Sequence, residues 1–197
     1  PFVIVVINAA KTTAEITNNP LTAPSNWGQI ITNVKGIFAK PNTDYVGAFI
    51  DSVIITAGSL LIITLFSSMA AWVLVRNKTR WSSALFMMFV AAMVIPFPVV
   101  MLPLVQWFRI LGDFLGIQLL RSYQGAFLAY LGFGCSMTIF IIHGFIKNIP
   151  LELEEAATID GCSKAGTFFR IVLPLLQPVM VTVLILNGIW IWNDYLL

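Results

Sequence analysis

The feature that most constrains the fold is the absence of Asp, Glu, Lys and Arg from four long segments. These segments are residues 52–75, 81–108, 122–146 and 171–193, and they are 24, 28, 25 and 23 residues long. A helix needs about 20 apolar residues to cross a bilayer. Lipid offers no partner to backbone N–H and C=O groups, so apolar segments of this length are expected to be helical. The sequence therefore predicts an all-α, polytopic transmembrane helical bundle.

Composition agrees with a membrane protein and excludes several other classes. Hydrophobic residues make up 58% of the chain and charged residues 10%, whereas a soluble domain carries about 25% charged residues. The net charge of +2 gives no basis for nucleic-acid binding. Cys135 and Cys162 fall in different environments and match no metal motif, so neither a disulfide nor a metal site is predicted. His143 has no second His or Cys nearby, which favours a structural role.

Four full-length spans are expected, and the third contains several prolines. Pro96, Pro98 and Pro103 each lack a backbone donor, so this helix is predicted to kink or partly unwind. Either a packing kink or a helix that lines a pathway would explain them. Residues 8–47 are expected to form a polar loop and residues 109–121 a short one. The predicted helices cover about 48–75, 81–108, 122–146 and 171–193.

The distribution of Lys and Arg predicts the orientation. Residues 76–80 and 147–170 hold six Lys or Arg in 29 residues, whereas 8–47 and 109–121 hold five in 53. Because cytoplasmic loops are enriched in positive charge, the first two segments are predicted to be cytoplasmic. The spans lack the buried carboxylate that is common in ion-driven carriers.

The segment 147–170 combines charge with small residues. Its "IPLELEEAATIDG" stretch predicts a helix, with Pro150 in the first turn and acidic residues near the positive end of the helix dipole. Gly161 is the expected stop, because glycine readily adopts the left-handed conformation that ends helices. A second short helix, about 163–169, is expected to lead into the last span. The stretch fits either a helix that docks on a partner or an ordinary solvated loop.

The spacing within this segment resembles a known motif. The segment contains, in order, Glu155-Ala156-Ala157, three residues, Gly161, nine residues, Ile171, one residue and Leu173-Pro174. This order resembles the "EAA" loop of bacterial ABC importer permease subunits. One departure is Cys162, where this branch usually has Ala. Four further blocks resemble the carbohydrate-type permeases: "FIDSVIITAGS" (49–59), "AAWVLVR" (70–76), "VIPFPVVMLPL" (94–104) and "WNDYLL" (192–197).

The resemblance implies a single permease domain over residues 1–197, with the type I ABC importer permease fold and a cytoplasmic coupling loop at 147–170. Five spans are then present at least in part, the first as its end at residues 1–7, and we expect a sixth beyond this fragment. The implied partners are a second permease subunit, two copies of a cytoplasmic ATPase, an extracellular solute-binding protein and the lipid of a bacterial inner membrane. ATP and Mg would bind to the ATPase, since this chain contains no G-x-x-x-x-G-K-[ST] loop. No cofactor, metal or nucleic acid is expected to bind this chain, which is not expected to be an enzyme.

The resemblance also suggests site residues. The carboxylates of Glu154 and Glu155 are expected to meet Arg or Lys in a cleft of the ATPase, and Asn187 offers an amide at mid-span. The coupling set is Glu154, Glu155, Ala156, Ala157, Asp160 and Gly161. The candidate pathway set is Asn187, Trp190 and Asn193, with Trp192 beside them, although an interfacial aromatic belt would also explain the tryptophans.

Two other classes of function remain open. An ion-coupled secondary carrier of a small polar solute would need intramembrane carboxylates or paired unwound repeats, and only the prolines of the third span point that way. A membrane-embedded enzyme would need a catalytic constellation within the bundle. Asp51 and Asp194 lie only at span ends, so the enzyme interpretation has little support.

Overall fold

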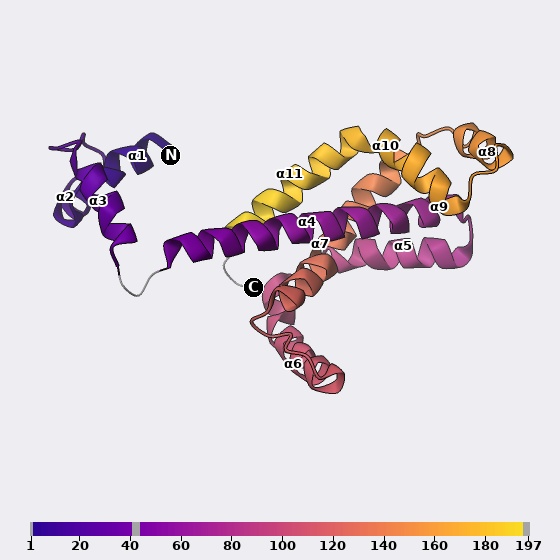
Figure 1. The fold of residues 1–197 in the computed structure, drawn as a ribbon, viewed down its shortest axis with the longest axis horizontal. Helices are drawn as coiled ribbons and strands as arrows, with labels where there is room; N and C mark the ends of the chain where they lie inside the picture. The colour runs from indigo at the N-terminus through magenta and orange to yellow at the C-terminus, as the bar shows by residue number, and fades with distance from the viewer. Residues whose placement is uncertain (1, 41–43, 195–197) are drawn as a thin grey trace. The chain divides into compact units, whose positions relative to one another are not determined.

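The computed structural model describes residues 2–40 and 44–194, in which all regular structure is helical (Figure 1). The chain divides into two compact units, residues 1–51 and residues 52–197, and each is described by itself. The predicted all-α class is confirmed. The single domain over residues 1–197 stays a prediction.

The first unit contains helices where the sequence analysis expected a loop. A capping box begins α2, in which the Thr12 side chain accepts from the Glu15 N–H and Glu15 accepts from the Thr12 N–H. Asn33 on α3 donates to the carbonyls of Ala9 (2.9 Å) and Lys11 (3.0 Å). The prediction of a loop over 8–47 was therefore wrong. The capping box and the Asn33 hydrogen bonds stabilise short helices in this segment. The elements are α1 (Phe2–Ala9), α2 (Thr13–Asn18) and α3 (Gln29–Phe38).

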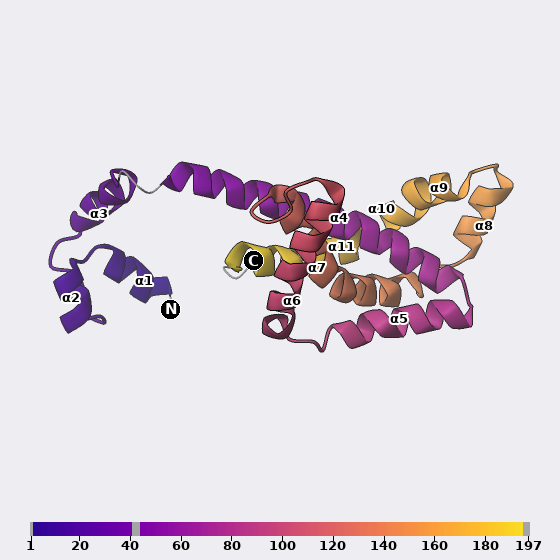
Figure 2. The same cartoon turned by 90° about the horizontal axis from the view of Figure 1, so that it is seen from below.

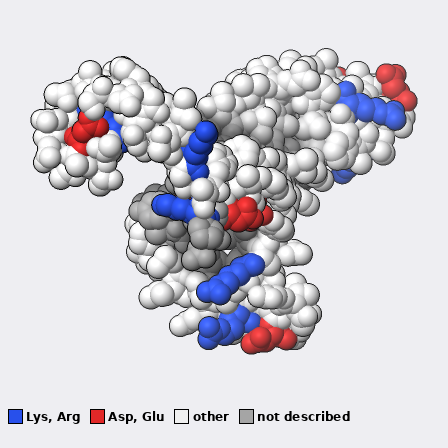
Figure 3. Space-filling model, turned by 60° about the vertical axis from the view of Figure 1, so that its left-hand side comes forward, with Lys and Arg blue, Asp and Glu red and all other residues white. Residues whose placement is uncertain are grey.

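The second unit is a bundle of long apolar helices with a cap of short ones. Figures 1 and 2 both show α8 and α9 at the end of the bundle where α4 passes into α5. On the face that Figure 3 presents, charged side chains form small groups on a mostly uncharged surface. The elements are α4 (Tyr45–Arg76), α5 (Arg80–Ala92), α6 (Phe97–Leu115), α7 (Tyr123–Ile146), α8 (Glu152–Ile159), α9 (Lys164–Thr167), the π-helix η1 (Phe168–Val172), α10 (Leu173–Leu175) and α11 (Gln177–Asn193).

The core of this unit joins α7 to the helices that follow it. α5 and α11 both pack against α7. Ile142 and Ile146 of α7 are fully buried together with Val172 of η1, Leu176 between α10 and α11, and Val183 of α11. Large apolar side chains remain exposed along the outer faces of the long helices, as expected for helices that face lipid.

The predicted third span is not one helix. α5 ends at Ala92 and α6 begins at Phe97, with Pro96 as the extended N-cap of α6. Pro98 lies in the first turn of α6, where its missing N–H costs nothing, and only Pro103 lies inside the helix. The helix predicted over about 81–108 is therefore divided into two, and the kink or partial unwinding predicted at its prolines is found near Pro96. α6 also continues to Leu115, well into the segment expected to be a loop.

The predicted last span is also interrupted. The helical run Lys164–Leu175 and α11 are bent by 76° relative to each other. Pro178 has no N–H to donate to the carbonyl of Pro174, so the hydrogen-bond ladder is broken at this point. A single helix over about 171–193 was predicted, and the bend was not. Three described helices, α4, α6 and α7, are long and apolar enough to cross a membrane, and the bent pair would make a fourth.

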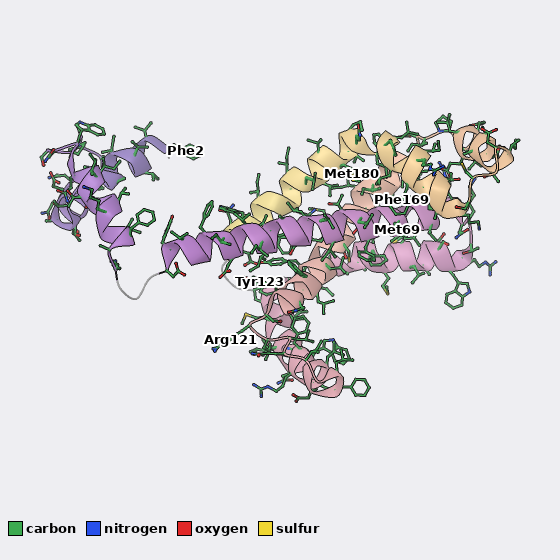
Figure 4. The ribbon with its side chains drawn as sticks, viewed as in Figure 1. Phe2, Met69, Arg121, Tyr123, Phe169 and Met180 are labelled. Carbon is green, nitrogen blue, oxygen red and sulfur yellow. The ribbon has the colours of Figure 1, made fainter. Side chains whose placement is uncertain are left out.

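The connection between α6 and α7 is tight. Ser122 caps α7 by accepting from the Gly125 N–H (3.2 Å), and its hydroxyl donates to the carbonyl of Leu119 (2.8 Å). Arg121 has φ 58°, and Arg121 and Tyr123 flank the cap, as Figure 4 shows. This turn returns the chain to the bundle and leads it into the helix that ends at the candidate site.

Candidate coupling site

The candidate site is built on α8, whose two ends have the predicted chemistry. Three glutamates lie in the first turn, at 152, 154 and 155, where the helix dipole favours negative charge. At the other end Gly161 has φ 83°. The Gly161 N–H donates to the carbonyl of Thr158 (3.1 Å) and the Cys162 N–H to that of Ala157 (2.9 Å). These bonds form a Schellman motif, so the expected stop at Gly161 is confirmed.

Glu154 is buried against another helix rather than exposed. Its Oε1 accepts from Arg76 Nε (2.8 Å) and lies 2.7 Å from Arg76 Nη2, while its Oε2 accepts from Trp72 Nε1 (2.9 Å). Arg76 Nη2 also donates to the carbonyl of Ile149 (3.0 Å). We expected the Glu154 carboxylate to face a partner chain. The structure corrects this, because both of its oxygens are bound within the chain.

Trp72 and Arg76, which hold this carboxylate, were missed as site residues. They lie four residues apart on α4, so their side chains leave the same face of the helix. The indole of Trp72 also packs against Phe168, with ring centroids 5.4 Å apart. The sequence signal available for them was their position at the charged end of a predicted span. They lie in the block 70–76, which was noted only for its resemblance to the carbohydrate-type permeases.

The other five coupling residues differ in exposure. Glu155, Ala156, Asp160 and Gly161 are exposed, whereas Ala157 is buried. Ile159, which was not anticipated as a site residue, also points outward and is 85% exposed. Because Glu155 and Ile159 lie four residues apart, an acidic and an apolar group are neighbours on the free side of α8. A face of this kind suits a protein partner better than bulk water.

A cleft of about 550 Å³ lies beside α8. Trp72 and Arg76 of α4 line it, together with Glu155 and Ile159 of α8 and Lys164 of α9. The cleft brings opposite charges and apolar side chains to one opening at the end of the bundle. It can therefore receive a side chain from another protein.

α8 is joined to the last helices through a short connection. Ser163 caps α9 by accepting from the Gly166 N–H (3.2 Å). The second short helix was predicted near residues 163–169, and it continues through η1 without interruption. Phe168 is 1% exposed and belongs to the main core. A displacement of α8 would therefore act directly on the packed core.

The candidate pathway residues differ in burial and in the bonds that they make. Asn187 is fully buried, and its Nδ2 donates to Thr138 Oγ1 and to the carbonyl of Val183, each at 3.0 Å. Its Oδ1 accepts from no described residue. Trp190 is partly exposed and packs edge-on against Tyr130, with centroids 5.6 Å apart. Asn193 is exposed and donates to the carbonyl of Ile189 on its own helix.

Comparison with known proteins identifies the family. Residues 63–197 match the model of the binding-protein-dependent transport system inner membrane component. The chain belongs to this family. It is therefore a transport permease and a multi-pass membrane protein, and members of this family are not enzymes. The ion-coupled carrier that the sequence analysis left open is not supported.

Relatives of this permease carry names from sugar transport. It is 44% identical over 197 residues to the probable starch degradation products transport system permease protein of Thermoanaerobacterium thermosulfurigenes. It is 31% identical over 206 aligned residues to the multiple sugar-binding transport system permease protein of Streptococcus mutans. Both alignments cover this whole chain and 68% of the relative. The melibiose/raffinose/stachyose import permease protein of Bacillus subtilis is 37% identical over 75% of this chain and 52% of its own length.

The side chains that could ligate a metal are dispersed over the described ranges 2–40 and 44–194. Among those residues, no group of three or more His, Cys, Asp or Glu is placed to hold a metal ion. Cys135 and Cys162 are both free thiols. His143 stacks on Phe86, with centroids 3.8 Å apart.

Proposed function

We propose that this permease forms, with a second related permease, the pathway through which an ABC importer of a bacterial inner membrane takes up a sugar or oligosaccharide. An extracellular binding protein delivers the solute. Two copies of a cytoplasmic ATPase bind ATP and Mg and drive the cycle. Family membership supports the transport system, and the names of the relatives support a carbohydrate as the solute.

The single observation that carries the coupling role is the asymmetry of α8. Glu154 is bound to Trp72 and Arg76, which fastens one side of the helix to the end of α4. Glu155 and Ile159 remain exposed on the other side. A helix held firmly on one side and free on the other can receive a force from a partner and pass it to the bundle.

The positions of two basic segments support a cytoplasmic location for α8. Arg76 begins the basic turn 76–80 and donates to the carbonyl of Ile149 in the segment 147–170. Both segments therefore lie at the same end of the bundle. Their shared excess of Lys and Arg favours the cytoplasmic side.

Charge reversal on α8 tests this proposal. Glu155→Lys replaces the exposed acid and leaves the Glu154 contacts in place, so the subunit should insert and fold normally. We expect the purified transporter to lose the ATPase, or to hydrolyse ATP without uptake of solute into vesicles. Removal of a charge at a buried interface costs roughly 2–5 kcal/mol, and reversal adds repulsion.

The matched control is Asp113→Lys, which makes the same reversal at an exposed position near the end of α6. It should retain both the ATPase and uptake. Wild-type uptake by Glu155→Lys would show that α8 is not the coupling element.

A further inference from the structure

A second cleft, of about 810 Å³, lies at the same end of the bundle between the start of α5 and the end of α7. Its charged wall includes Lys78, Arg80 and Lys147, and no Asp or Glu lines it. Arg76 also lines the cleft, but its charge is already paired with Glu154. The other three cations form no ion pair with any described residue, so the cleft holds uncompensated positive charge.

A buried polar side chain also faces this cleft. His143 is 7% exposed and lines the cleft, and its ring lies flat against Phe86. Its imidazole nitrogens have no hydrogen-bond partner among the residues that the structure describes. An imidazole nitrogen in the wall of a cleft can donate a hydrogen bond to an oxygen of a ligand.

The backbone adds to the attraction for anions. α5 is 13 residues long, and its N-terminus opens onto the cleft at Thr79 and Arg80. Thr79 Oγ1 accepts from the Ser82 N–H (3.1 Å), which leaves the preceding N–H groups of the first turn for other acceptors. Helix N-termini of this kind attract phosphate groups.

The remaining wall of the cleft is apolar. Leu74, Phe86 and Met87 line it, and Met87 is 62% exposed. These residues lie on α4 and α5, whereas Lys78 and Arg80 lie where α4 passes into α5 and Lys147 is the C-cap of α7. A free phosphate ion would use only the charged wall. A phospholipid would use both walls, with its phosphate at the cations and its glycerol and acyl chains against the apolar side chains.

We infer that this cleft binds the phosphate headgroup of an anionic phospholipid of the inner leaflet. Basic pockets between membrane helices on the cytoplasmic side recognise such headgroups. This cleft is lined by the end of α4 and by Leu151, and α8 packs against the same end of α4. A bound lipid would therefore stabilise the end of the bundle to which α8 is attached. The site is separate from the exposed face of α8.

Native mass spectrometry of the complete transporter tests the inference. The transporter is extracted from nanodiscs that contain phosphatidylcholine, with or without phosphatidylglycerol. We expect wild type to retain phosphatidylglycerol in preference to phosphatidylcholine. The double variant Lys78→Gln/Arg80→Gln should weaken this preference on the order of tenfold, since each basic residue near an anionic surface contributes a severalfold effect. His143→Phe keeps the ring stack and removes the nitrogens, and it should also lower retention.

The matched control is Lys164→Gln/Arg170→Gln, which removes two positive charges from the other basic segment, 147–170, at positions outside this cleft. It should retain the lipid as wild type does. Two results in the variants would overturn the inference. One is an equal loss of bound lipid in the two double variants. The other is wild-type lipid retention in both Lys78→Gln/Arg80→Gln and His143→Phe. Equal retention of the two lipids by wild type would also overturn it, as would displacement of the bound lipid by inorganic phosphate, which would assign the cleft to a free anion. Loss of the ATPase by Lys78→Gln/Arg80→Gln with unchanged lipid retention would assign it to a protein contact.

Discussion

Glu154 and Glu15 are carboxylates from the two units of this permease, and both are held by several donors. Glu154 is buried, and its partners Trp72 and Arg76 lie 82 and 78 residues away in the sequence. Glu15 is at the surface, and its partners Thr12 and Ser25 lie three and ten residues away. One carboxylate fastens a helix to a distant part of the fold, while the other closes a local turn. The cost of disrupting each should differ accordingly.

The largest effect is expected from Arg76→Leu. This change leaves the buried Glu154 carboxylate without its cation, and an unpaired buried charge costs about 3–5 kcal/mol. We expect α8 to detach from α4, which faster proteolysis within residues 147–163 of the purified subunit would report. The double variant Arg76→Leu/Glu154→Leu removes both charges and should recover much of the lost stability. Equal damage in the single and double variants would show that the ion pair itself is not what holds α8.

A smaller effect is expected from Gly161→Val, because the turn after α8 depends on backbone conformation rather than on charge. Gly161 has φ 83°, and a β-branched residue there costs on the order of 1–3 kcal/mol. The second short helix should be misdirected, so the assembled transporter should lose coupling between hydrolysis and uptake. Gly144→Ala is the control, since a Cβ at Gly144 in α7 meets nothing within 4 Å. If Gly161→Val couples normally, the position of α9 does not depend on this turn.

Asn187 is a third case, a buried amide without charge in the middle of a span. Asn187→Leu removes two donated hydrogen bonds together with an acceptor that has no partner, so the net loss of stability should be about 1 kcal/mol or less. Uptake should fall if the amide contacts the solute, while assembly and basal ATPase activity persist. Thr138→Val removes the other member of the Asn187–Thr138 bond and serves as the control for packing. Unchanged uptake in Asn187→Leu would leave Asn187 as a packing residue.

These residues also show what could be predicted from the sequence. The spans over about 48–75 and 122–146, the stop at Gly161 and the acidic first turn of α8 depend on composition and nearest neighbours, and each is found in the structure. The capping box at Thr12 was equally local but was overlooked. The side of α8 that binds α4 could not be predicted, because it depends on which helix end meets residue 154 in three dimensions. The breaks near Pro96 and Pro178 had a local signal, but packing decides whether a proline kinks a membrane helix or ends it.

The smallest effect is expected at Glu15, and it should depend on pH. The Ser25 hydroxyl, followed by the Thr12 N–H, donates to the Glu15 carboxylate and lowers its pKa from 4.5 to about 2. Because the pKa is lower in the folded state, this contribution to stability is fully present above pH 4.5 and is lost as the pH falls toward 2. Hydrogen-exchange protection of the α2 amides, corrected for the intrinsic exchange rate, should therefore decline across this range. Glu15→Gln cannot titrate and should show weaker protection that does not change with pH. If wild-type protection is constant between pH 4.5 and 2, the capping box does not hold α2.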